Sequence, residues 1–128
     1  MSKNKFLVYY SPVVLWLMLI FIASSIPTLP DVNKYNFPID KVVHFLEFSV
    51  LGFLLVRAVY FCGTSLDLKM AILITCGIAL FFAAVDEFHQ LYIPDRIASM
   101  ADFISDCVGI GVSQTAFVLL IRNRSRKS

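Results

Sequence analysis

The stretch that decides the fold runs from Asp86 to Gly109 and reads DEFHQLYIPDRIASMADFISDCVG. It joins two long apolar segments, although a connector between such segments needs only a few polar residues. Instead it carries a dense set of ionisable side chains: Asp86, Glu87, His89, Asp95, Arg96, Asp102 and Asp106. Placing charges at the boundary of a membrane costs free energy, so residues of this kind usually serve a function. We therefore expect a functional site here.

The composition indicates an integral membrane protein. The chain has 128 residues, of which 59% are hydrophobic and only 16% are charged. Soluble domains have about 45–50% apolar and about 25% charged residues, so this chain has too little polar surface to cover a water-soluble globule. Its length allows one domain. The net charge of +2 is too small to indicate a nucleic-acid partner, and we expect none.

Four apolar segments are long enough to cross a bilayer as helices. A helix rises about 1.5 Å per residue, so about 20 residues span the hydrocarbon core. We expect spans over residues 6–26, 42–62, 70–87 and 102–121, followed by a basic and disordered tail over residues 122–128. The third is slightly short, so it should extend into its polar end or stand close to the membrane normal. The sequence thus predicts an all-α fold, a bundle of four transmembrane helices in a single domain.

The ends of these segments leave two further questions. A cleaved signal peptide is the alternative for the first segment, but its apolar run is longer than the core of a signal peptide, which has about 7–15 residues. Residues 27–40 hold three prolines and read as a loop, and residues 63–69 read as a short turn. Residues 89–101 read either as a loose loop or as an amphipathic piece on the membrane surface.

The basic residues predict the orientation in the membrane. Four spans place both termini on one side, and loops rich in lysine and arginine stay in the cytoplasm. The side of the termini holds Lys3, Lys5, Arg57, Lys69, Arg122, Arg124, Arg126 and Lys127, whereas the other side holds Lys34, Lys41 and Arg96. We therefore expect a multi-pass protein of the cell membrane with cytoplasmic N- and C-termini. Nearly all acidic residues then lie toward the extracytoplasmic side.

This topology makes polar residues from separate segments converge at the outer face. Residues three or four apart share a helix face. The expected stripes are Asp40, His44 and Glu47; Asp86 with His89 or Gln90; and Asp102 with Asp106. Ser24 and Ser25 end the first span at the same level. Gly109 and Gly111 continue the last stripe and would permit close contact between helices.

Each residue also has an ordinary structural interpretation. His44 would be a buried neutral imidazole, and Asp40 and Asp102 would cap the helices that they begin. Arg96 would neutralise the acids around it, and His89 would be solvated. So many ionisable groups at one depth, in a chain so poor in charge, favour a functional site over these interpretations.

Four motifs follow one another in a characteristic order. They are W-x-x-x-I-F-x-x-S-S-x-P (Trp16–Pro27), D-K-x-x-H-F (Asp40–Phe45), D-E-x-x-Q-x-x-x-P-x-R (Asp86–Arg96) and, after Ser99, D-x-x-x-D-x-x-G (Asp102–Gly109). Together they resemble the VanZ-like family of small membrane proteins, over almost the whole chain. The resemblance implies a role in the cell envelope, and the family is named for a protein associated with low-level teicoplanin resistance. It implies no settled reaction and no particular cofactor.

The chain departs from the family pattern at two positions. Asp95 stands where the pattern has glycine, and Asp106 stands where it has asparagine. The second departure adds a negative charge at the membrane boundary, which would either raise affinity for a cation or change the pKa of a group in the site. The resemblance implies that five residues belong to the family pattern: Asp86, Glu87, Gln90, Arg96 and Asp102. It makes His89 and Asp95 weaker candidates for the site.

The first hypothesis is a protein that binds or modulates an anionic component of the envelope or a lipid. Arg96 and Lys41 would hold a phosphate or carboxylate, since the planar guanidinium suits two-point contacts of this kind. The remaining ligand-binding residues would be Ser25, Asp40, Glu87, Gln90 and Asp106. Besides the lipid bilayer, the partner would be a lipid-linked envelope precursor or a glycopeptide.

The second hypothesis is a membrane-embedded hydrolase or transferase that acts on a lipid-linked envelope substrate. His44 would be the general acid or base, because imidazole titrates near neutral pH. Asp86 or Asp102 would orient it, and Arg96 would stabilise developing negative charge. No G-x-S-x-G motif is present, although Ser24 or Ser25 beside His44 is geometrically conceivable.

A metal-dependent version and a transport function are the remaining alternatives. A metal would use His44, Glu47, Asp86 and Asp102, but no H-E-x-x-H or C-x-x-C spacing appears, so we expect no metal. A small ion or proton transport component would use the acidic side chains of the spans. Binding or modulation is the interpretation that we prefer.

Overall fold

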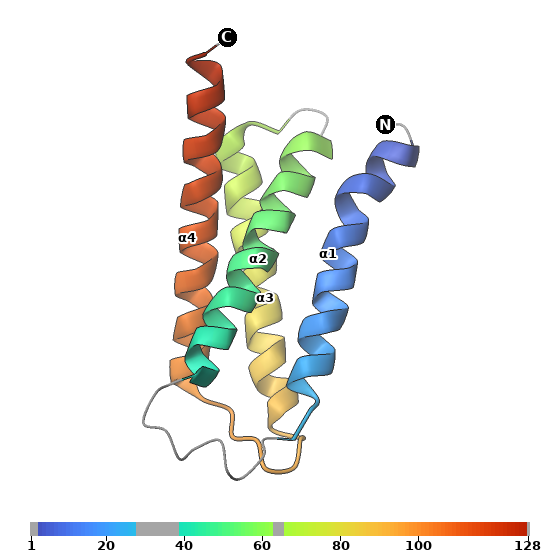
Figure 1. The fold of residues 1–128 in the computed structure, drawn as a ribbon, viewed down its shortest axis with the longest axis vertical. Helices are drawn as coiled ribbons and strands as arrows, with labels where there is room; N and C mark the ends of the chain where they lie inside the picture. Colours follow the sequence, from blue (N-terminus) through green and yellow to red (C-terminus); the bar gives the residue numbers. More distant parts are fainter. Residues whose placement is uncertain (1–2, 28–38, 63–65, 128) are drawn as a thin grey trace.

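The computed structural model consists of four helices that pack side by side (Figure 1). It describes residues 3–27, 39–62 and 66–127. The helices are α1 (Lys3–Ser24), α2 (Ile39–Cys62), α3 (Leu68–Gln90) and α4 (Met100–Ser125). All four are long and apolar enough to cross a membrane. The prediction of an all-α protein with four transmembrane helices is therefore confirmed, and the chain is a multi-pass membrane protein in contact with the bilayer.

The ends of the helices differ in places from the expected spans. Helix α3 extends into its polar end as far as Gln90, as its short apolar run requires. The tail was predicted to be disordered, which is wrong for its first residues, because α4 continues through Arg122 and Arg124 to Ser125. No glycine or proline interrupts this stretch, and basic side chains are favourable near the negative C-terminal end of a helix.

The connections were predicted from their prolines, glycines and short lengths. Most of the predicted loop (residues 28–38) and part of the predicted turn (residues 63–65) lie outside the described residues. Between α3 and α4, residues 91–99 form turns and bends rather than an amphipathic helix. This connection lies at one end of the molecule, and the first and last described residues lie at the other (Figure 1).

Helix α2 lies at the centre and contacts each of the other three helices. Its buried residues Phe48, Leu51 and Leu55 form a core with Ile110 of α4. On the opposite side, the indole Nε1 of Trp16 donates a hydrogen bond to the Glu47 carbonyl oxygen at 2.9 Å and ties α1 to α2. The position of α2 places its first turns between the polar ends of α3 and α4.

Helices α2 and α4 approach each other closely at glycines. A Cβ atom added at Gly109 would meet the Phe45 carbonyl oxygen and would lie 2.9 Å from Ser49 Oγ. The expected close contact at Gly109 is thus confirmed. It is wrong for Gly111, where an added Cβ would have no described atom within 4 Å, whereas Gly52, which we did not predict, faces Ser113 of α4. The α2–α4 contact therefore depends on Gly52 and Gly109.

Polar and apolar side chains are distributed in the opposite way to a soluble protein. Large apolar residues such as Leu15, Phe81 and Leu119 are more than half exposed on the outside of the bundle. The buried polar set comprises Ser24, His44, Thr75, Asp86, Glu87, Gln90, Asp102, Asp106, Ser113 and Gln114. This arrangement suits a protein surrounded by hydrocarbon, because its polar groups must find partners inside the protein.

Replacing Gly109 by alanine should destabilise the bundle. The new methyl group would meet the backbone of α2, which cannot rotate away, and overpacking of this kind costs about 1–3 kcal/mol. We expect Gly109→Ala to lower the free energy of unfolding by that amount in a detergent denaturation experiment. Gly111→Ala is the matched control, and it should be neutral or stabilising by up to about 1 kcal/mol. Equal loss in both variants would contradict the close contact.

Candidate functional site

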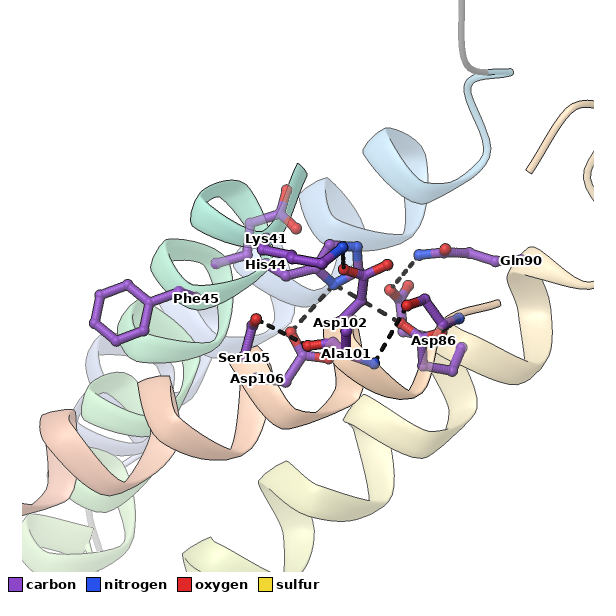
Figure 2. A network of polar contacts seen from close by, with 12 residues as sticks. Lys41, His44, Phe45, Asp86, Gln90, Ala101, Asp102, Ser105 and Asp106 are labelled. Atoms are coloured by element: carbon purple, nitrogen blue, oxygen red, sulfur yellow. Dashed lines mark hydrogen bonds and ion pairs between the residues drawn. The ribbon is translucent and has the colours of Figure 1, made fainter. Parts of the chain in front are cut away.

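Polar side chains of α2, α3 and α4 meet at the end of the bundle opposite the described chain termini (Figure 2). The set consists of Lys41 and His44 from α2, Asp86, Glu87 and Gln90 from α3, and Asp102 and Asp106 from α4. All except Lys41 are buried. We call this set the polar cluster. The convergence of three helices predicted from the sequence is present in the structure.

Local sequence explains why the cluster forms where it does. Helix α4 begins after Ser99, whose Oγ accepts a hydrogen bond from the backbone N–H of Ala101 at 3.2 Å. Ser99 is therefore the N-cap, and the interpretation of Asp102 as the cap is wrong. Asp102 lies in the first turn, where a carboxylate still benefits from the positive end of the helix dipole. Asp40 likewise lies in the first turn of α2 and is exposed.

Lys41 and Asp102 form an ion pair at the exposed edge of the polar cluster. The Lys41 ammonium donates to Asp102 Oδ1 at 2.9 Å. The side chain of Lys41 is 40% exposed, whereas that of Asp102 is only 3% exposed. The cation thus faces outward and the carboxylate faces the interior.

His44 and Asp106 form the buried centre of the cluster. His44 Nδ1 lies 3.1 Å from Asp106 Oδ1 and 4.0 Å from Glu87 Oε1. The other oxygen of Glu87 accepts a hydrogen bond from the Ser99 backbone N–H at 2.8 Å, which fixes the carboxylate. Asp106 Oδ2 and Glu87 Oε1 are buried and have no hydrogen-bond partner among the described residues. The group that orients His44 is therefore Asp106, and neither Asp86 nor Asp102 takes the role we expected.

Asp86 pairs within its own helix. Gln90 Nε2 donates to Asp86 Oδ2 at 2.9 Å, one turn along α3. Of the two partners expected for Asp86, the structure thus selects Gln90 rather than His89. Glu47, one turn beyond His44, is partly buried, and its carboxylate makes no hydrogen bond within the described part of the chain. Its backbone carbonyl instead accepts the Trp16 bond.

Arg96 links the connection between α3 and α4 to the end of α1 through two hydrogen bonds. Its Nε and Nη2 donate to the carbonyl oxygens of Ile26 and Ala23, both at 3.1 Å. Ala23 lies in the last turn of α1, where its carbonyl also accepts the Ile26 backbone N–H at 3.2 Å, and Ile26 follows the helix. Nε and Nη2, one edge of the guanidinium, are thus used by the protein. A ligand-binding role for Arg96 stays a prediction and would use the N–H groups that these two bonds leave.

The turn before Arg96 explains one departure from the family pattern. The backbone N–H of Arg96 bonds to the Ile93 carbonyl at 3.2 Å, which closes a turn with Pro94 and Asp95 at its centre. Asp95 has a φ of 62°, a left-handed conformation that favours glycine and that aspartate tolerates better than most residues. A glycine at this position would adopt the same conformation without strain, which accounts for the glycine expected there.

Ser25 contacts His89 and not His44. Ser25 Oγ lies 3.0 Å from His89 Nε2 and donates its own proton to the Phe21 carbonyl at 2.7 Å. Since the hydroxyl proton is committed, the imidazole N–H must be the donor to Ser25, so His89 does not act as a base toward it. His89 also stacks on Phe21, with ring centroids 4.4 Å apart. From the sequence we expected His89 to be solvated, and only the meeting of the ends of α1 and α3 reveals this contact.

Two groups of side chains place their ligand atoms within 4.8 Å of one another, as a metal site requires. One comprises His44, Glu87 and Asp106, and the other Asp40, His44 and Asp102. Neither is the set of His44, Glu47, Asp86 and Asp102 considered from the sequence. Helical spacing identified the faces, but it did not show which faces meet.

Comparison with known proteins identifies a family. The family model described as VanZ/LLP1 matches residues 6–121. This match confirms the resemblance drawn from the motifs. No curated protein and no solved structure matches the chain.

The left-handed turn should tolerate glycine but not a branched residue at position 95. We expect Asp95→Gly to leave the stability unchanged or slightly higher. Asp95→Val should lower the free energy of unfolding by about 1–2 kcal/mol, because a side chain branched at the β carbon is crowded in this conformation. Thermal unfolding of the purified variants measures both. A valine variant as stable as the glycine variant would contradict the turn.

Proposed function

The chain belongs to the VanZ/LLP1 family, and we propose that it is a cell-envelope membrane protein whose polar cluster binds the anionic headgroup of a lipid or envelope component. The cluster lies at one end of the transmembrane helices, at the level where headgroups meet the hydrocarbon. A bound headgroup would thus contact the cluster while its acyl chains stayed in the bilayer. By binding this lipid or envelope component, the protein would modulate the cell envelope.

The exposure of Lys41 carries this proposal. Its side chain is 40% exposed, while the side chain of Asp102, which anchors it, is 3% exposed. An approaching anion therefore meets a cation first, and the ammonium has three donors, of which Asp102 uses one. The buried carboxylates hold the cation in place and would bond hydroxyl or amide groups of the same headgroup. A lipid-linked envelope precursor has both kinds of group.

The link to glycopeptide antibiotics belongs to this proposal as well. A protein that holds an envelope precursor or a glycopeptide at the outer face would keep the drug from its cell-wall target. Teicoplanin-type resistance is thus one consequence that headgroup binding predicts. It depends on the orientation of the site, which we propose to be extracytoplasmic.

A membrane-embedded hydrolase or transferase is the second candidate, and the His44–Asp106 contact favours it. A carboxylate 3.1 Å from Nδ1 fixes an imidazole and leaves the other ring nitrogen for acid–base work. The described residues place no serine beside His44, so the nucleophile would be water. Within this candidate, Asp106 replaces Asp86 and Asp102 as the orienting residue.

Removing the charge of Lys41 should weaken binding of anionic lipid. The purified full chain in zwitterionic detergent would be titrated with phosphatidylglycerol. We expect Lys41→Gln to lower the affinity about tenfold or more, since a hydrogen bond to a charged group contributes about 1.5–3 kcal/mol and about 1.4 kcal/mol is a factor of ten. Lys41→Arg keeps the charge and is the matched control.

Two results would overturn the binding proposal. One is equal affinity of the wild type for phosphatidylglycerol and phosphatidylcholine, and the other is unchanged affinity in Lys41→Gln. Mass spectrometry of the titrated lipid adds a further reading, because a chemically converted lipid would favour the enzyme candidate. The same variants expressed in a teicoplanin-susceptible bacterium test whether any change in susceptibility depends on the site.

The proposed orientation predicts which cysteine reagents reach each end. Ile97 is 85% exposed in the connection beside the cluster, and Lys127 lies at the opposite end. In intact cells, a membrane-impermeant thiol reagent should label Ile97→Cys and spare Lys127→Cys. Permeabilised cells should label both, and the wild type measures the background from the native cysteines. Labelling of Lys127→Cys in intact cells would reverse the orientation.

A further inference from the structure

The buried centre of the polar cluster holds carboxylate oxygens that lack partners. Asp106 is fully buried, and its Oδ2 has no hydrogen-bond partner among the described residues. Glu87 Oε1 is likewise buried and unpartnered, and it is the oxygen that faces His44. Proteins rarely leave buried polar atoms unsatisfied, and a bound ion satisfies carboxylate oxygens that no protein donor reaches.

The charges around these atoms are unbalanced. The buried carboxylates Asp86, Glu87, Asp102 and Asp106 face only Lys41 and His44 within the cluster. Even a protonated His44 leaves more negative than positive charge. Arg96 directs two of its nitrogens to the carbonyl oxygens of Ala23 in α1 and of Ile26 just after it. A further cation would therefore stabilise the cluster.

The geometry of His44, Glu87 and Asp106 suits a metal ion. Ligands at about 2.0–2.1 Å from a tetrahedral ion lie about 3.3 Å apart. The distances from His44 Nδ1 to Asp106 Oδ1 and Glu87 Oε1 are 3.1 and 4.0 Å, close to that separation. The Ser99 backbone N–H donates a hydrogen bond to the other Glu87 oxygen, Oε2. Hydrogen bonds of this kind commonly orient the side chains that bind a metal.

The second group is a weaker candidate. In it, Asp102 Oδ1 already binds the Lys41 ammonium, and Asp40 is exposed to competition from water. Lys41 would also repel a cation placed there. Among the described residues, no lysine or arginine forms an ion pair with Glu87 or Asp106, and the first group contains both unpartnered oxygens. An ion is therefore expected at the first group, between α2, α3 and α4, and not at the second group beside Lys41.

We propose that His44, Glu87 and Asp106 bind a divalent transition-metal ion of the Zn²⁺ or Mn²⁺ class. One imidazole and two carboxylates match the mixed nitrogen and oxygen ligands that these ions accept, whereas Mg²⁺ and Ca²⁺ favour oxygen alone. The ion would replace the proton that His44 Nδ1 and Asp106 Oδ1 share in their hydrogen bond. Asp106 supplies a fully buried carboxylate to the site, and one of its oxygens has no hydrogen-bond partner among the described residues.

Metal titration of the full chain tests the site directly. The protein is purified through a tag without histidine, stripped with EDTA, and dialysed against Zn²⁺ in zwitterionic detergent. We expect one Zn²⁺ per chain, displaced by excess Mn²⁺ but not by the same excess of Mg²⁺ or Ca²⁺. Glu87→Gln and Asp106→Asn should each weaken Zn²⁺ binding about tenfold or more. Both keep the size of the side chain, so these variants should fold.

Asp67→Asn is the matched control. Asp67 caps α3 at the other end of the molecule through a 2.8 Å bond from the Met70 N–H, and asparagine caps equally well. It should bind Zn²⁺ as the wild type does. Absence of stoichiometric binding by the wild type, unchanged affinity in both cluster variants, or equal loss in Asp67→Asn would overturn the site. The detergent contains no anionic lipid, so this result is independent of the Lys41 experiment.

Discussion

A carboxylate inside a membrane protein must find its partner within the protein, because the surrounding hydrocarbon offers none. Each buried acid of the polar cluster meets this demand through another segment or another turn of its helix. Asp102 uses Lys41, Asp106 uses His44, and Glu87 uses the backbone of Ser99. These bonds join the starts of α2 and α4 to the end of α3. The same groups that are costly to bury thus determine how three helices meet.

Close packing of α2 and α4 makes these contacts possible. Gly109 lies one helical turn from Asp106 and faces the backbone of Phe45, the residue after His44. The absence of a side chain at Gly109 brings the two helices together where the imidazole must reach the carboxylate. The connection before α4 contributes separately, since the left-handed turn at Asp95 directs Arg96 to the end of α1. Packing and turn geometry together position the side chains of the cluster.

The lengths of the apolar segments were sufficient to predict four helices, and helical spacing was sufficient to predict their polar stripes and the close approach at Gly109. It could not predict contacts that depend on the direction of a side chain between helices. Arg96 binds backbone carbonyls at a helix end, and no sequence pattern marks such carbonyls. Ser25 meets His89 because two helices end at the same level. The pairing of His44 with Asp106, rather than Asp86 or Asp102, depends on the rotation of α4 about its axis, which the helical period leaves undetermined.

The contact between His44 and Asp106 is the one on which the geometry of the cluster rests, and a double-mutant cycle measures it. The free energies of unfolding of His44→Leu, Asp106→Leu and the double variant would be compared with that of the wild type in detergent. Direct contact between two buried groups predicts a coupling energy of about 1–3 kcal/mol. Additivity to within about 0.5 kcal/mol would show that the two side chains do not touch and would contradict the cluster.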